Sequence, residues 1–224
     1  MWIKICGIRD VETAKAIAGL GAQAIGLNFY RPSPRFVAIP QARQIVEAIP
    51  QATLPVGLFV NSSVTEIRQI CSECGLSTIQ LHGDEPPEML AELAEFRVIR
   101  AFRVASQPES PGSSQMLAGV DGYLARCKEL NASPWGCLID AAVPGHYGGS
   151  GNVVDWNTLA TTYDTKNAPP LILAGGLTVQ NVAQAIETVQ PWGVDVASGV
   201  ELTRGIKDLR LVEQFIAETR RSCA

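Results

Sequence analysis

Residues 171–201, LILAGGLTVQNVAQAIETVQPWGVDVASGVE, contain two short apolar segments that each end in a turn of small residues. The first segment, 171–174, stops at Gly175-Gly176. Thr178 is then placed to cap a helix over 179–189. An apolar strand that runs through a glycine turn into a helix is typical of α/β proteins.

The second segment, 194–197, stops at Ser198-Gly199. Glycine lets backbone N–H groups approach an anion closely, and a helix N-terminus adds partial positive charge. Either turn alone could simply reverse the chain. Two such turns at the end of a repeated strand–helix chain favour a phosphate cup, because eight-stranded parallel barrels often bind phosphate after their last two strands.

The composition predicts one globular domain over residues 1–224, with 46% apolar and 18% charged residues. The net charge is −4 and no dense basic run is present, which argues against nucleic-acid binding. No run of about 20 apolar residues predicts a membrane span. Lys4, Arg9 and Asp10 interrupt any secretory pattern at the N-terminus, so we expect a cytoplasmic protein.

Six cysteines lack the spacing of a disulfide framework. Cys71 and Cys74 form an isolated CxxC inside an expected helix over 65–74, away from any strand end. We interpret them as small helix residues and not as a redox or metal pair.

The remaining chain repeats the strand–helix unit. The expected strands are 2–8, 24–29, 56–60, 78–82, 98–104, 136–140, 171–174 and 194–197. The expected helices are 11–18, 41–49, 65–74, one after 86, one within 107–131, 156–163, 179–189 and 207–220. This alternation predicts a single (β/α)8 TIM barrel. A doubly wound open sheet is the alternative, but the chain lacks a dinucleotide fingerprint.

A barrel carries its chemistry at the C-terminal ends of its strands. The polar residues at those ends are Cys6, Asn28, Gln80, His82, Asp140 and Asp195. Cys6 is a candidate base or nucleophile, or a small buried thiol. Asp140 is a candidate general acid or base, or a salt-bridged carboxylate. Asp195 could orient a substrate, although pairing with Lys4 in the lumen is the favoured interpretation. The chain has two histidines, too few for a metal site.

These residues belong to segments that together resemble the phosphoribosylanthranilate isomerase family of tryptophan biosynthesis. The segments are KICGIRD (4–10), AIGLNFYRPSPRFV (24–37), VGLFVN (56–61), IQLHGDE (79–85), LIDA (138–141), YGGSG (147–151), LILAGGL (171–177) and GVDVASGVE (193–201). They cover nearly every strand end in the family's order, so the match is specific.

The resemblance implies an Amadori rearrangement with Cys6 as general base and Asp140 as general acid. It implies that Arg35 meets the anthranilate carboxylate, and that the backbone of Gly149, Ser150, Gly151, Gly175, Gly176, Ser198 and Gly199 surrounds the phosphate. Gln80, His82 and Asp195 are the further substrate-binding candidates. We expect a phosphorylated small-molecule substrate, no cofactor or metal, and a monomer in preference to a homodimer.

Three other functions remain open. A different phosphosugar isomerase would keep the phosphate cup but replace the Cys6–Asp140 pair. A metal-dependent epimerase would carry more histidines at strand ends. A non-catalytic phosphometabolite-binding protein would bind its ligand without turnover.

Overall fold

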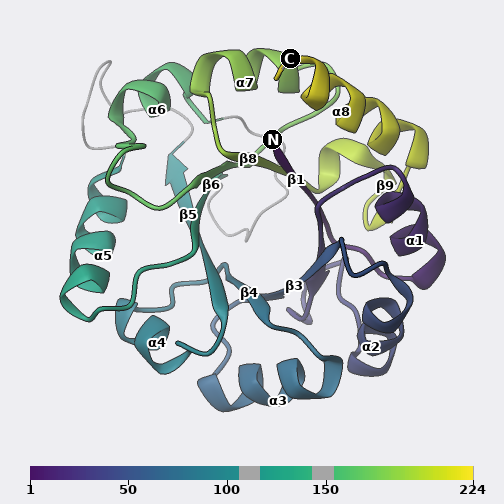
Figure 1. Cartoon of the computed structure of the whole chain (residues 1–224), viewed down its shortest axis with the longest axis horizontal. Coiled ribbons are helices and arrows are strands. Elements are labelled where there is room, and N and C mark those ends of the chain that lie inside the picture. The colour runs from purple at the N-terminus through teal and green to yellow at the C-terminus, as the bar shows by residue number, and fades with distance from the viewer. Residues whose placement is uncertain (106–116, 143–153, 224) are drawn as a thin grey trace.

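Eight parallel strands close into a barrel within residues 1–105, 117–142 and 154–223, which the computed structural model describes (Figure 1). They are β1 (Trp2–Cys6), β2 (Ala24–Asn28), β3 (Leu54–Phe59), β4 (Thr78–Leu81), β5 (Arg97–Ala105), β6 (Gly136–Ala142), β7 (Leu171–Leu173) and β8 (Gly193–Val196). Each strand pairs with the next, and β8 pairs with β1. This closure confirms the expected barrel and excludes the open sheet.

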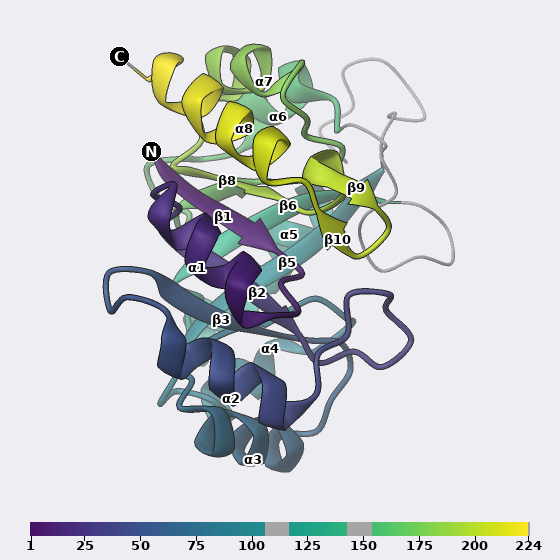
Figure 2. The same cartoon turned by 90° about the vertical axis from the view of Figure 1, so that its right-hand side faces the viewer.

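Helices surround the barrel and lie between successive strands (Figures 1 and 2). They are α1 (Val11–Gly19), α2 (Ile39–Ala48), α3 (Val64–Cys74), α4 (Pro87–Glu92), α5 (Ala118–Glu129), α6 (Trp156–Thr162), α7 (Val182–Val189) and α8 (Leu209–Arg221). Within the described ranges, every helix is too short or too polar to span a lipid bilayer. Both chain termini lie at the end of the barrel where the strands begin (Figure 2).

Side-chain alternation along each strand divides the interior into two layers. Ile3 and Ile5 of β1 belong to the large apolar cluster between the strands and the helices. Lys4 and Cys6 point the other way, into the lumen, as their positions in the sequence predict. A smaller apolar cluster fills the lumen near the strand N-termini; its buried members are Ala24, Val56, Ile99, Ala101, Leu138, Ile172 and Ala174.

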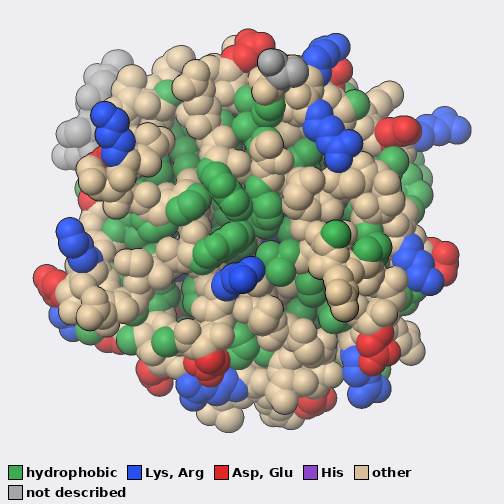
Figure 3. Space-filling view, in the orientation of Figure 1, with side chains coloured by type: hydrophobic (Ala, Val, Ile, Leu, Met, Phe, Trp, Pro, Cys, Tyr) green, Lys and Arg blue, Asp and Glu red, His purple; other side chains and the backbone are tan. Residues whose placement is uncertain are grey.

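Two tryptophans, Trp2 and Trp135, pack against this lumen cluster, and a third, Trp192, packs against their rings. Trp2 stacks on Trp192 with ring centroids 5.3 Å apart, and Trp135 meets both rings edge-on. Figure 3 looks onto this end of the barrel and shows hydrophobic side chains gathered near its centre. The N-terminal end of the lumen is therefore filled with apolar groups and leaves its chemistry to the other end.

One local expectation is wrong. Thr178 does not cap a helix over 179–189: α7 begins at Val182, and the Asn181 side chain instead accepts from Thr178 N at 2.8 Å and donates to Gly176 O at 2.9 Å. The helix expected over about 207–220 is present as α8, which begins at Leu209 because Asp208 caps it. The residues before it form a small antiparallel hairpin, β9 (Glu201–Thr203) and β10 (Ile206–Lys207), which the sequence analysis missed.

Candidate functional site

A polar pocket opens at the C-terminal end of the lumen. It is lined by Cys6, Asn28, Tyr30, Ser33, Arg35, Leu58, Val60, Gln80, His82, Asp140, Asp195 and Ala197. A smaller pocket shares Asp140, Asp195 and Ala197 with it, and adds Gly175, Gly176 and Ser198. The barrel thus brings together the six predicted side chains and both small-residue turns that the structure describes.

Cys6 lies beside a buried ion pair. Lys4 and Asp195 are neighbours in the β1–β8 register, and Lys4 Nζ donates to Asp195 Oδ1 at 2.8 Å. The lumen pairing favoured for Asp195 from the sequence is therefore confirmed. Burial raises the pKa of the Cys6 thiol, while the ammonium of Lys4 pulls that pKa down. A Cβ on Gly26 of the neighbouring strand β2 would lie 2.6 Å from Cys6 Sγ, so this position requires glycine.

His82 approaches Asp140 across the pocket, with Nε2 3.3 Å from Asp140 Oδ2. On its other side, Gln80 Nε2 lies 2.7 Å from His82 Nδ1. With the amide nitrogen donating to Nδ1, the proton of a neutral imidazole belongs on Nε2, which faces the carboxylate. Within the described chain, Gln80 Oε1 is buried without a hydrogen-bond partner, and the contact of His82 Nε2 with Asp140 lacks hydrogen-bond geometry. Two polar atoms of the pocket wall are thus able to bind polar groups of a ligand.

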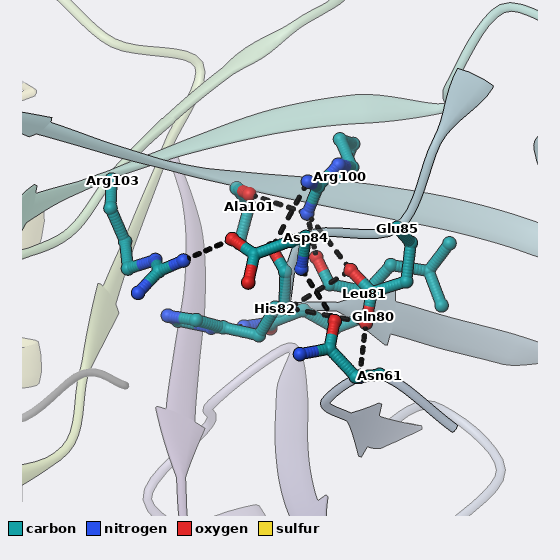
Figure 4. A network of polar contacts seen from close by, with 10 residues as sticks. Asn61, Gln80, Leu81, His82, Asp84, Glu85, Arg100, Ala101 and Arg103 are labelled. Atoms are coloured by element: carbon teal, nitrogen blue, oxygen red, sulfur yellow. Dashed lines mark hydrogen bonds and ion pairs between the residues drawn. The ribbon is translucent and has the colours of Figure 1, made fainter. Parts of the chain in front are cut away.

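The turn after β4 holds His82 in place (Figure 4). Glu85 is 3% exposed and accepts hydrogen bonds from Gly83 N at 2.9 Å and Asn61 N at 2.8 Å. Arg100 lies 3.2 Å from the same carboxylate and also donates to Gly83 O at 3.1 Å. Because these groups are buried and hydrogen-bonded to one another, the backbone directly after His82 has little freedom.

Arg35 reaches the pocket from the loop after β2, and its guanidinium is held by Glu201 of β9. Nε donates to Glu201 Oε1 at 2.7 Å, and Nη2 donates to Glu201 Oε2 at 2.9 Å. Lys207 of β10 donates to Glu201 Oε1 at 3.0 Å and to Ala197 O at 2.7 Å. The hairpin β9–β10 therefore connects Arg35 to the turn that follows β8.

The two small-residue turns lie against each other. Gly175 and Gly176 have φ values of +80° and +64°, which favour glycine. A Cβ on Gly199 would lie 1.8 Å from Leu177 O, so only glycine allows this approach. Because α7 begins at Val182, its N-terminus lies further from the first turn than the sequence predicts. The third expected phosphate segment, Gly149, Ser150 and Gly151, lies outside the described residues.

Three charged residues around the site, Arg103, Glu201 and Lys207, were not expected from the sequence. Arg103 lies opposite Asp140 in the β5–β6 register and contacts Asp84 at 2.5 Å. Its place in the alternation Ile99, Ala101, Arg103 could have indicated a lumen-facing cation. Glu201 and Lys207 carried no such signal, because the hairpin that bears them has strands of three and two residues.

Comparison with known proteins identifies the family. The family model described as N-(5'phosphoribosyl)anthranilate (PRA) isomerase matches residues 3–218. The chain belongs to this family. An N-(5'-phosphoribosyl)anthranilate isomerase of Stutzerimonas stutzeri is 43% identical over 219 residues, which cover 97% of this chain and 96% of the relative. The corresponding protein of Acidithiobacillus ferrooxidans is 40% identical over 218 residues, 97% of each chain.

Solved structures agree with the sequence comparison. The phosphoribosyl anthranilate isomerase of Thermotoga maritima has a TM-score of 0.84 and 32% identity, with 99% of each chain covered. A phosphoribosyl anthranilate isomerase in complex with reduced 1-(o-carboxyphenylamino)-1-deoxyribulose 5-phosphate has a TM-score of 0.81 and 31% identity, again with 99% of each chain covered. The family, the isomerase class, the pathway of tryptophan biosynthesis and the barrel fold expected from the sequence are confirmed.

Proposed function

We propose that this chain catalyses the Amadori rearrangement of N-(5'-phosphoribosyl)anthranilate with Asp140 as general acid and Cys6 as general base. The observation that carries this assignment is that Cys6 and Asp140, from strands on different sides of the barrel, line one pocket. Each is 5% exposed, so both groups face a ligand in a site with little water.

The two groups suit the two proton transfers that the rearrangement needs. Asp140 gives a proton to the furanose ring oxygen, the C1–O bond breaks, and the anthranilate nitrogen supplies electrons to form a protonated Schiff base. The Cys6 thiolate then removes the proton from C2. The C2–H bonding pair becomes the C1=C2 double bond, and the π pair of the C1=N bond moves onto the iminium nitrogen to give the enol-amine. The iminium is the electron sink, so no cofactor or metal is required for this step. A thiolate is suited to a carbon acid, and a carboxylic acid to an oxygen.

The remaining site residues are assigned to binding. The Arg35 guanidinium meets the anthranilate carboxylate, and Gln80, His82 and Asp195 line the sugar-binding part of the pocket. The backbone of Gly175, Gly176, Ser198 and Gly199, together with that of Gly149, Ser150 and Gly151, surrounds the phosphate. The solved relative that is in complex with a reduced carboxyphenylamino-deoxyribulose phosphate supports a ligand with these three chemical parts.

The proposed working form is a single barrel domain over residues 1–224, as a monomer in the cytoplasm. All six cysteines are free thiols, which fits a reducing compartment. Among the described residues, the large apolar side chains that remain exposed are Met1, Trp192, Leu202, Ile206 and Leu209. They divide between the two ends of the barrel, which supports a monomer, although the Thermotoga maritima relative is described as dimeric. Light scattering at micromolar concentration tests the assignment, and a doubled mass would contradict it.

A turnover assay tests the proposed activity. Phosphoribosylanthranilate is generated enzymatically, and its loss is followed by fluorescence after this protein is added. The expected result is rapid loss that depends on protein concentration and persists in the presence of a chelator. Binding of the substrate without turnover would favour the phosphometabolite-binding protein, and sensitivity to the chelator would favour a metal-dependent enzyme.

A further inference from the structure

Arg35 has one edge of its guanidinium already in use. A guanidinium carries five N–H donors, and Glu201 takes one from Nε and one from Nη2 in a bidentate pair. The edge formed by Nη1 and Nη2 is the second position at which a guanidinium binds a carboxylate bidentately. Arg35 lines the pocket and Glu201 does not, which leaves this second edge available to a ligand in the pocket.

With a ligand bound, Arg35 would contact two carboxylates, that of Glu201 and that of the ligand. Their two negative charges exceed the single positive charge of Arg35 by one. Lys207 supplies the missing positive charge: its side chain is 1% exposed, and its ammonium lies 3.0 Å from Glu201 Oε1. It contributes to a separate surface recess beside Gly7 and Arg9, and not to the pocket that holds Arg35. Lys207 therefore adds its charge from behind Glu201, without being part of the pocket wall.

We propose that Arg35, Glu201 and Lys207 form a charge-balanced triad in which Lys207 is a positioning residue for recognition of the substrate's carboxylate. The empty triad has two cations and one anion in a buried place. One further carboxylate makes it neutral. This inference rests on the proposed function, because it takes the anthranilate carboxylate as the group that meets Arg35.

The pKa directions of Lys207 and Glu201 are consistent with a charged pair. Burial lowers the pKa of Lys207, and Glu201 opposes that fall, so the ion pair helps to keep the ammonium charged. Burial would also raise the pKa of Glu201, but Arg35 and Lys207 hold it below its ordinary value. Gly7 completes the arrangement, because a Cβ there would meet Arg35 Cδ at 2.5 Å and displace the side chain.

Carboxylate selectivity tests the proposal. It is measured as the ratio of kcat/KM for phosphoribosylanthranilate to kcat/KM for the phosphoribosylaniline analogue, which lacks the carboxylate. Lys207→Met should lower this ratio about tenfold, the scale of one unit charge acting over several ångströms in protein. Lys15→Met, a change to an exposed lysine on α1, is the matched control and should leave the ratio unchanged.

A double variant separates charge balance from hairpin packing. In Glu201→Gln/Lys207→Met, Arg35 alone supplies one positive charge, as in the unmodified triad, so the ratio should return to within about threefold of its original value. If Lys207→Met does not fold, the double variant still decides, because loss of a merely structural partner predicts a low ratio there. An unchanged ratio in Lys207→Met, or a ratio that stays low in the double variant, would overturn the proposal. Failure of the unmodified protein to turn over phosphoribosylanthranilate would instead overturn the proposed function, and this inference with it.

Discussion

The two halves of the barrel lumen are built from opposite kinds of side chain. The half near the strand N-termini contains apolar residues such as Ala24, Val56, Leu138 and Ile172, closed by the three tryptophans. The half near the strand C-termini contains the Lys4–Asp195 pair, Cys6, and the contact between His82 and Asp140. One set of strands thus carries a layer that stabilises the fold and a layer that holds reactive groups. The comparison predicts that substitutions in the two halves affect different measurements.

The largest effect is expected at the Lys4–Asp195 pair of the C-terminal half. Lys4→Met leaves Asp195 buried without its cation, which should lower the free energy of unfolding by about 3–5 kcal/mol. Chemical denaturation measures this loss. Lys4→Met/Asp195→Asn is the matched control and should recover much of it, because no unpaired charge remains. A single variant as stable as the original would show that the pair does not stabilise the barrel.

Lys4→Met should also change the pH dependence of activity. The Lys4 ammonium lowers the pKa of Cys6, so its removal raises that pKa. If the Cys6 thiolate is the base, as proposed, the acidic limb of kcat/KM should move to higher pH. A limb at the same pH in Lys4→Met would mean that Cys6 does not set it.

Ile172→Ala tests the apolar half. Ile172 is completely buried in the lumen cluster, and its truncation should cost about 2–5 kcal/mol of unfolding free energy. The value of kcat should stay within a few-fold at a temperature where the variant is folded, because no reacting group lies there. A large fall in kcat with intact stability would break the division between the two halves.

Arg35→Lys tests the specificity of the reactive half. Lysine cannot reproduce the bidentate fork, so catalytic efficiency should fall by on the order of 1.5–3 kcal/mol, the value of a charged hydrogen bond. The fall should shrink sharply with the phosphoribosylaniline analogue. Arg31→Lys in the same loop is the matched control, because Arg31 stacks over Phe36 outside the pocket. An equal loss on both substrates would remove Arg35 from carboxylate recognition.

The smallest effect is expected outside the lumen. Cys71 and Cys74 are buried on α3, and burial raises the pKa of Cys71 to about 12, which suits a packing residue and not a reactive thiol. Changing both to alanine should leave turnover within a few-fold of the original. Loss of activity in a folded double variant would reopen the redox or metal interpretation.

Much of this division could be predicted from the sequence. The alternation in WIKICGI placed Lys4 and Cys6 in the lumen, and strand order then placed Asp195 next to Lys4, although 191 positions separate them. The same alternation, read along β5, would have indicated Arg103. Period-two patterning and small-residue turns are local signals, and a closed barrel converts them into long-range contacts.

The contacts of the hairpin could not be predicted in this way. Glu201 binds Arg35 across 166 positions, and both lie outside the barrel strands, where no periodicity fixes their direction. The cap expected at Thr178 failed for a related reason. The side chain of Asn181 bonds the turn itself and delays the helix, a competition between local hydrogen bonds that propensity does not resolve.

The central claim is that Asp140 and Cys6 act in sequence, and trapping of the open intermediate tests it most directly. Borohydride is added during turnover of substrate carrying deuterium at C2, and the reduced Schiff base is quantified by mass spectrometry. In Cys6→Ala the trapped species should accumulate with its deuterium retained, while in Asp140→Asn it should not form. Both variants should lose ~100-fold or more in kcat, the scale for removal of a general acid or base, with a much smaller change in substrate affinity. Near-normal kcat in Cys6→Ala, or abundant trapping in Asp140→Asn, would contradict the account.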